Sequence, residues 1–344
     1  MAGNEALEVN PPNAVYHIST NGSDWLWTVF AIMTLCDLIV IGWHFAVPRG
    51  QRVFHQIAAI ILTTAAIAYF AMASDLGATP IATEFSHHGR IAGVSRQVWY
   101  VRYIMFFITT PALLLMLVLA SGLALSDIVT LVFFGLVFVV ARLVGALVSS
   151  TYKWGFFVFS IAGLVYVWWA LLGPARTSAK VIGADYHSAF GVGAGILSFI
   201  WLLYPICWGL SEGGNVITPT SEMVFYGILD LLSMPFFLFI HLFALSKLDL
   251  AALQLYSGKF STTAATGAGA AGVAAHEKAA HPVAGTTTAT TNGTGTATAT
   301  QKKSGLFSRH GHHDAPAPAA TGDMGVTQPV AAEAPPRVSE ATVV

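Results

Sequence analysis

Seven apolar stretches, each long enough to cross a lipid bilayer, dominate this sequence and limit what it can fold into. A membrane-spanning α-helix needs about 20 consecutive, mainly apolar residues. Hydrophobic residues make up 55% of the chain and charged residues 10%, whereas about a quarter of a soluble domain is charged. The sequence therefore predicts an all-α membrane protein, a bundle of seven transmembrane helices. The stretches are residues 25–47, 54–76, 99–120, 125–147, 155–174, 188–210 and 222–246.

The apolar stretches divide the chain into three parts. Residues 1–23 are polar and form a predicted extracellular segment, and residues 24–250 form the seven-helix domain. Residues 251–344 are rich in Thr, Ala, Gly and Pro, so they cannot bury enough apolar area to offset the entropy of ordering. We expect a disordered cytoplasmic tail. Its His310-Gly-His312-His313 cluster is interpreted as solvated histidines and not as a metal site.

Basic residues near the ends of the stretches predict the orientation. An N-terminus outside places most of them on the inner side, as the positive-inside rule requires. Seven spans then place the C-terminus in the cytoplasm. The outer side would carry Asn21-Gly-Ser23, a glycosylation sequon with Asn21 as the acceptor. The inner basic residues are Arg49, Arg52, Arg176, Lys180, Lys247 and Lys259.

Two ionisable residues within the spans are candidate functional groups. Asp230 lies near the middle of the seventh stretch, where a charge is costly, so it marks a functional-site hypothesis. Arg102 begins the third stretch, where it would either extend to the membrane interface or pair with Asp230. Glu212 and Glu222 flank the loop between the sixth and seventh stretches and, taken alone, are solvated loop acids.

The other polar and aromatic positions allow more than one interpretation. Trp201, Tyr204 and Trp208 share one face of the sixth stretch, which would face lipid, pack in the core or form the wall of a pocket. Arg142 lies near the outer end of the fourth stretch, where its side chain would extend to the interface. Asp37 lies inside the first stretch without an assigned partner.

Together these features resemble the microbial rhodopsins, in their fungal branch, over about residues 20–250. The resemblance implies that Arg102 and Asp230 form a buried charge pair and that Glu212 and Glu222 are outward-facing proton-release carboxylates. It also implies that Trp201, Tyr204, Trp208 and Thr109 line a retinal pocket. The motifs that carry it are Val101-Arg102-Tyr103, Thr109-Thr110-Pro111, Trp201-Leu-Leu-Tyr204-Pro205-Ile-Cys-Trp208, Ser211-Glu212-Gly213 and Leu229-Asp230-Leu-Leu-Ser-Met234-Pro235.

The sequence departs from the family where the photochemistry resides. Met234 stands where the family has the lysine that forms the retinal Schiff base. Lys247 is roughly 20 Å further along the helix and cannot replace it. Met105 and Met116 stand where pumps have their proton acceptor and donor, and Phe106 replaces a tryptophan of the retinal pocket. We therefore expect a vestigial pocket and no covalent retinal cofactor.

The departures preserve the charge balance of the buried site. A buried cation without a counter-charge is very unfavourable. Loss of the lysine together with the acceptor acid removes one positive and one negative group, which leaves Arg102 and Asp230. Thioether side chains such as Met234 fill the vacated space adaptably. The pattern predicts a site rebuilt as packed core.

This pattern is similar to the fungal opsin-related proteins, the subgroup of the 30 kDa heat-shock protein. The resemblance implies a stress-associated, chaperone-like protein of the plasma membrane, in contact with lipid, that modulates the proton ATPase. It also implies a homo-oligomer. The alternative is a photoreceptor that binds retinal or another apolar ligand, or an ion-translocating rhodopsin that uses Arg102, Asp230, Glu212 and Glu222.

Two other classes of function are not expected. No nucleophile–base pair, metal-ligand spacing or phosphate-binding loop is evident, so the sequence predicts neither an enzyme nor a metal site. A net charge of −1 gives no electrostatic footprint for nucleic acid.

Overall fold

The computed structural model describes residues 4–48, 52–85, 94–249, 253 and 255. In this part of the chain, seven helices are long and apolar enough to cross a membrane. The prediction of a seven-helix membrane bundle is confirmed. The predicted tail lies almost entirely outside the described residues.

The helical elements follow one another with short connections. Three of the spans include a π-helical turn, written η, which joins two helical segments or ends one. The elements are α1 (Glu5–Val9), α2 (Thr20–Ala46), α3 (Val53–Ala73), α4 (Tyr100–Val118), α5 (Leu125–Leu147), α6 (Lys153–Ala170), η2 (Leu171–Ala175), α7 (Arg176–Ile182), α8 (Ala184–Trp208), η3 (Gly209–Gly213), α9 (Pro219–Leu231), η4 (Leu232–Phe236) and α10 (Phe237–Leu245).

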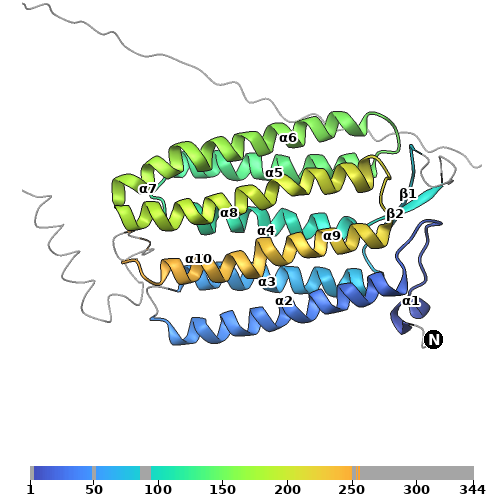
Figure 1. The fold of residues 1–344 in the computed structure, drawn as a ribbon, viewed down its shortest axis with the longest axis horizontal. Coiled ribbons are helices and arrows are strands. Elements are labelled where there is room, and N and C mark those ends of the chain that lie inside the picture. The colour runs from blue at the N-terminus through green and yellow to red at the C-terminus, as the bar shows by residue number, and fades with distance from the viewer. Residues whose placement is uncertain (1–3, 49–51, 86–93, 250–252, 254, 256–344) are drawn as a thin grey trace, which may run out of the picture. The chain divides into compact units, whose positions relative to one another are not determined.

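The long helices form a closed ring around one core. Consecutive spans are neighbours, α2 packs against α9, and α4 contacts α8 across the centre. Figure 1 shows the helices side by side along the long axis. Side chains on the inner faces, from Val29 on α2 to Leu238 on α10, are fully buried. This arrangement places residues of α4, α5, α8 and η4 around one interior point.

The fifth span is longer than the sequence predicts. The predicted end of the fifth stretch at residue 174 is wrong, because the chain stays helical through Pro174 and first turns at Gly183. Proline has no backbone N–H to give to an α-helical ladder. The i→i+5 pattern of η2 accommodates this interruption as a π-bulge.

One end of the bundle is covered by a short hairpin between α3 and α4. Strands β1 (Thr79–Ala82) and β2 (Ser95–Val98) pair antiparallel, with Thr79 opposite Val98. The N-terminal segment joins them, because Tyr16 bridges to Arg96 and the Gln97 side chain accepts from the Ile18 N–H. Figure 1 shows α1, the hairpin and the N-terminus at this end. Under the predicted orientation this is the extracellular end.

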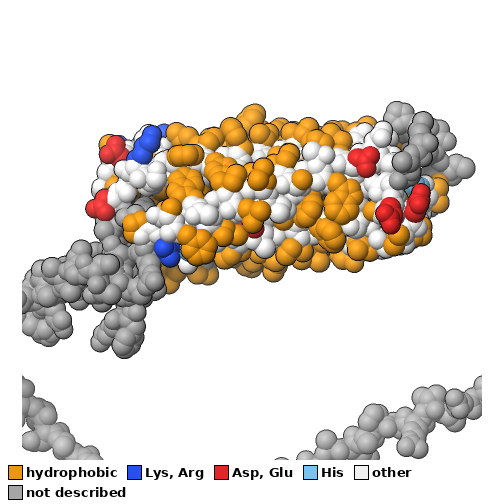
Figure 2. All heavy atoms as spheres, turned by 90° about the horizontal axis from the view of Figure 1, so that it is seen from below, with side chains coloured by type: hydrophobic (Ala, Val, Ile, Leu, Met, Phe, Trp, Pro, Cys, Tyr) orange, Lys and Arg blue, Asp and Glu red, His pale blue; other side chains and the backbone are white. Residues whose placement is uncertain are grey.

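The outer surface of the bundle is apolar. Figure 2 shows one face covered by hydrophobic side chains, with almost all charged side chains near its two ends. Large apolar residues point outward along the spans, among them Leu35, Leu38, Phe133 and Phe199. Such a band matches the hydrocarbon thickness of a bilayer. The protein is a multi-pass membrane protein.

Glycine lets α5 and α6 approach closely, which yields a prediction. A Cβ at Gly163 would lie 2.9 Å from the Phe134 carbonyl oxygen and 3.1 Å from the Phe138 nitrogen. Since both atoms belong to backbone, Gly163→Ala should force the helices apart and lower the free energy of unfolding by about 1–3 kcal/mol.

Gly155 on the same helix is the matched control, since a Cβ there meets no atom within 4 Å. Gly155→Ala should be neutral or stabilising, by up to about 1 kcal/mol, because alanine favours the helix. Thermal unfolding of the two variants in detergent measures the difference. Equal midpoints would show that the α5–α6 contact is not as tight as described.

Candidate functional site

A buried ion-pair cluster lies beneath the hairpin, with Glu222 at its centre. Glu222 is in the first turn of α9 and is 0% exposed. Its Oε2 accepts from Arg96 Nη2 at 2.7 Å, and its Oε1 accepts from Arg102 Nη1 at 2.8 Å. Arg96 comes from β2 and Arg102 from α4, so one carboxylate joins three elements. Charge-assisted hydrogen bonds of this kind are roughly twice as strong as neutral ones.

Glu212 on η3 completes the cluster. Its Oε1 lies 3.7 Å from Arg102 Nη1 and accepts from the Tyr103 hydroxyl at 2.9 Å, while Ser211 and Tyr226 donate to its other oxygen. The interpretation of Glu212 and Glu222 as solvated loop acids is wrong, because both are buried. Two arginines, Arg96 and Arg102, and two glutamates make this set neutral in sum.

The expected direct pair of Arg102 and Asp230 is also wrong. The ion pairs of Arg102 among the described residues go to Glu212 and Glu222, and the Arg102 guanidinium lies 4.0 Å above the Tyr226 ring. Asp230 is eight residues after Glu222 on the same helical span, which is about 12 Å along the axis. A long arginine side chain at position 102 reaches the outer carboxylates instead of the deeper one.

Asp230 is held by tyrosines. Its two carboxylate oxygens accept from the Tyr69 and Tyr204 hydroxyls, each at 2.5 Å, and the Tyr204 hydroxyl also lies 2.8 Å from Ser233 Oγ. All four residues are buried. Tyr69 is not predicted as a site residue from the sequence, although a polar aromatic in an otherwise apolar span is an available signal. Arg96 falls between two predicted spans, where no pattern in the sequence singles it out.

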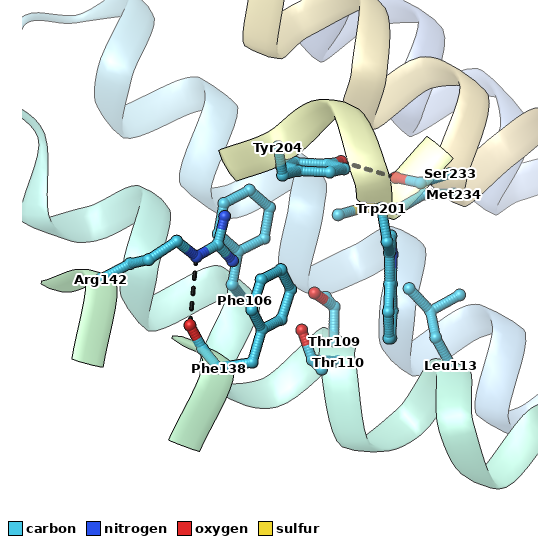
Figure 3. A pocket seen from close by; sticks show the side chains of 10 residues that line it. All are labelled: Phe106, Thr109, Thr110, Leu113, Phe138, Arg142, Trp201, Tyr204, Ser233 and Met234. Carbon is cyan, nitrogen blue, oxygen red and sulfur yellow. Dashed lines mark hydrogen bonds between the residues drawn. The ribbon is translucent and has the colours of Figure 1, made fainter. Parts of the chain in front are cut away.

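A small cavity lies in the middle of the bundle next to this carboxylate. The volume of this cavity is about 10 Å³. Figure 3 shows the side chains converging from α4, α5, α8 and η4. The predicted pocket residues Phe106, Thr109, Trp201, Tyr204 and Met234 all line it. The other lining residues are Thr110, Leu113, Phe138, Arg142 and Ser233.

The remaining predicted pocket residues lie outside the cavity wall. Trp208 stacks on Phe157, with ring centroids 5.1 Å apart, and its indole N–H donates to the Arg142 carbonyl at 3.2 Å. Met105 is 1% exposed within the core.

Arg142 is in the interior, contrary to expectation. Instead of extending to the interface it is 2% exposed and points into the cavity (Figure 3). Its guanidinium lies 3.9 Å above the Phe138 ring, and its Nε donates to the Phe138 carbonyl at 3.1 Å.

Two predicted polar residues lie elsewhere. Asp37 is also interior, at 8% exposed, and accepts from Thr63 Oγ1 at 2.7 Å between α2 and α3. Asn21 is exposed in the first turn of α2.

Comparison with known proteins identifies the family. The family model described as bacteriorhodopsin-like protein matches residues 20–248. This chain belongs to the bacteriorhodopsin-like family. The resemblance to microbial rhodopsins is thereby confirmed, and the cavity lies inside the matched region.

Individual relatives support the fungal branch. Protein FDD123 of Trametes versicolor is 52% identical over 76% of this chain and 91% of its own length. The 30 kDa heat shock protein of Saccharomyces cerevisiae is 35% identical over 66% of this chain and 74% of its own length. Among solved structures, the light-driven proton pump rhodopsin of Coccomyxa subellipsoidea is 31% identical and aligns with a TM-score of 0.63, over 66% of this chain and 98% of that one.

The residues of the cavity do not fit a covalently bound retinal. A Schiff base requires a lysine amine, and the side chain at position 234 is a thioether. The described lysines, Lys153, Lys180 and Lys247, lie at or beyond helix ends. Retinal is a drug-sized ligand, and a pocket for such a ligand has a volume of roughly 300 Å³ or more. The cavity here has a volume of about 10 Å³, and the side chains of Arg142, Phe106 and Phe138 are among those that line it.

Proposed function

We propose that this protein is an opsin-related membrane protein that carries no covalent retinal and acts through protein or lipid contacts. The observation that carries the proposal is the cavity around Met234, which offers neither an amine nor the room for the chromophore. No enzymatic activity and no cofactor belong to this function.

Addition of all-trans retinal to the purified protein tests this proposal. We expect no visible absorbance band that hydroxylamine bleaches, because no imine forms at Met234. A hydroxylamine-sensitive band would show that the chromophore binds covalently, and a hydroxylamine-resistant band would indicate noncovalent retinal. Either result would overturn the proposal in favour of a photoreceptor.

Light-driven ion translocation is the second candidate. It is favoured by the 31% identity to a structure titled as a light-driven proton pump and by the buried carboxylates Glu212, Glu222 and Asp230. Against it, the buried residues Met105 and Met116 carry thioethers, whereas a proton relay needs ionisable groups.

We further propose a stress-associated, chaperone-like role at the plasma membrane, with the proton ATPase as a partner. Support comes from a relative whose name is 30 kDa heat shock protein and from the broad apolar surface of the spans. Co-reconstitution of both proteins in vesicles should lower the rate of ATP hydrolysis. Vesicles that contain an unrelated seven-helix protein at the same ratio are the control, and equal rates would exclude this partner.

The orientation belongs to the same proposal. With the N-terminus outside, the Glu222 cluster and the hairpin lie at the extracellular end of the bundle. An epitope tag at the C-terminus should bind antibody only after cells are permeabilised. Antibody binding to intact cells would show that the C-terminus lies outside, which contradicts the proposed orientation.

A further inference from the structure

Asp37 is an acidic side chain inside a membrane span that has no ion-pair partner among the described residues. The ion pairs found there join Glu84, Glu212 and Glu222 to lysine or arginine. Within the same part of the chain, Thr63 Oγ1 donates to Asp37 Oδ2 at 2.7 Å, and Asp37 Oδ1 has no hydrogen-bond partner. An ionisable residue inside a membrane span normally pairs with another polar or charged group. This carboxylate is therefore incompletely partnered.

The carboxylate lies at a depth that lipid headgroups do not reach. Asp37 is 17 residues after Thr20 and 9 residues before Ala46, the two ends of α2, which is about 26 Å and 14 Å along the axis. Its donor Thr63 is ten residues from either end of α3. The hydrocarbon core of a bilayer is about 30 Å thick, and the amines of lipid headgroups lie outside it. A cationic partner at this depth therefore has to come from protein.

The carboxylate lies just beneath the lipid-facing surface of the bundle. Asp37 is 8% exposed, and Thr63, to which it bonds, is an exposed residue. Helix α2 is the least buried of the seven described spans, with 28% of its apolar stretch buried, whereas the other spans have 33–61%. Figure 1 shows α2 at the lower edge of the bundle, and Figure 2, seen from below, shows a side that is almost entirely apolar between its ends. A second helix can reach this side from the bilayer.

The surface around Thr63 suits the packing of another helix. On α3, Ile60 and Ile67 lie on the same outward face as Thr63, three residues before it and four after it, and are 53% and 66% exposed. On α2, Leu38 and Gly42 are both exposed and lie one helical turn apart. A Cβ at Gly42 would meet no atom within 4 Å. Small residues on such a face let the backbone of a second transmembrane helix approach closely.

The described residues of a second copy of this chain offer no cation at the depth of Asp37. The arginines inside the bundle are at most 2% exposed, and the other described cations lie at or beyond span ends or in the last two turns of a span. The interior arginines are Arg96, Arg102 and Arg142, and the others are Arg52, Lys153, Arg176, Lys180 and Lys247. The partner that fits the charge is therefore a different protein.

We propose that the α2–α3 face around Asp37 and Thr63 docks a transmembrane helix of another membrane protein, one that carries a lysine or arginine at the depth of Asp37. The cation balances the Asp37 carboxylate, which Thr63 holds in place. The exposed apolar side chains and Gly42 provide the packing surface. This inference rests on the proposed function, because it names where the protein contact is made.

A synthetic helix tests the docking face. The full-length protein carries a donor dye in phosphatidylcholine vesicles, and the probe is an acceptor-labelled helix of about 20 leucines with one central lysine. We expect saturable energy transfer, with an apparent affinity about fivefold or more above that of the same peptide with leucine in place of the lysine. Equal transfer from the two peptides overturns the proposal.

Two variants with the same change in net charge locate the contact. Asp37→Asn keeps the shape of the side chain and should lower the affinity for the lysine peptide to that for the leucine peptide. Asp127→Asn removes an exposed carboxylate in the first turn of α5 and should bind the lysine peptide as the unmodified protein does. Equal binding by both variants overturns the proposal.

A second copy of this chain is the competing occupant of the face. Energy transfer between donor-labelled and acceptor-labelled copies of the protein detects it. Self-association that Asp37→Asn abolishes would show that a second copy occupies the face, and would overturn the assignment to a different protein. Self-association that Asp37→Asn leaves unchanged agrees with the assignment, because it places the contact between copies elsewhere.

Carbodiimide labelling of the unmodified protein keeps the test decisive if Asp37→Asn fails to fold. Dicyclohexylcarbodiimide is apolar and reacts with carboxyl groups that it can reach from the lipid. Mass spectrometry should find the adduct on Asp37, and the lysine peptide, unlike the leucine peptide, should lower its yield severalfold. Absence of the adduct, or of protection, overturns the proposal.

The retinal spectrum of the same preparation tests the proposed function separately. A retinal band would defeat that proposal. A spectrum without a band, together with no preference for the lysine peptide, would defeat only the docking face.

Discussion

Replacement of Glu222 by glutamine should lower the free energy of unfolding by about 3–5 kcal/mol, the largest loss we expect from a single substitution. Glu222 bonds to Arg96 and Arg102 at 2.7 and 2.8 Å, and all three side chains are at most 2% exposed. The amide keeps the shape but removes the charge, so two buried guanidinium groups are left with Glu212 as the one carboxylate of the cluster. Thermal or SDS-induced unfolding in micelles measures the loss.

Two other substitutions calibrate this result. Glu212→Gln should cost less, because Glu212 lies 3.7 Å from Arg102 and is bonded mainly to hydroxyl groups. Glu8→Gln on α1 removes an exposed carboxylate and should change the free energy of unfolding by less than about 0.5 kcal/mol. A Glu222 variant as stable as the Glu8 variant would mean that the cluster does not hold the elements together.

The second large effect that we expect is a visible absorbance band in a variant that can bind retinal covalently. Met234→Lys places an amine one helical turn after Asp230, which is the acid available to balance a protonated imine. Alone, it should give only a weak retinal band, because the Arg142 side chain occupies the cavity. Combined with Arg142→Gly, it should give a band several times stronger. Visible absorbance per mole of protein after retinal addition measures both.

A control double variant separates the effect of the lysine amine from the effect of the enlarged cavity. Met234→Gln combined with Arg142→Gly opens the same room without an amine and should give no hydroxylamine-sensitive band. Equal bands in the single and double lysine variants would show that Arg142 does not obstruct the chromophore. Light-driven proton transport by either variant would refute our interpretation of Met105.

The features predicted from sequence were those that depend on local pattern. The lengths of the apolar stretches specify seven spans, and the helical spacing of Trp201 and Tyr204 places both on one face. Met234 is recognised because it stands four residues after Asp230 in a motif that otherwise resembles the family.

The errors arose where the outcome depends on how a long side chain extends or on the partners it meets. Arg102 reaches along its helix toward either Asp230 or Glu222, and helical spacing does not choose between them. Arg142 near a span end normally extends to the interface, but here the Phe138 and Phe106 rings hold it inside. Pro174 normally marks a turn, but a π-helical turn carries the helix past it.

The distribution of ion pairs means that the two ends of the bundle are held together by different interactions. Within the described residues, every ion pair lies near the end covered by the hairpin: Arg96 and Arg102 with Glu222 and Glu212, and Lys153 with Glu84. At the opposite end, where α10 terminates, the described contacts include apolar packing and the hydrogen bond from the Tyr186 hydroxyl to the Asp249 carbonyl. Any rearrangement of the helices should therefore open the bundle at the end where α10 terminates, with the hairpin end as its pivot.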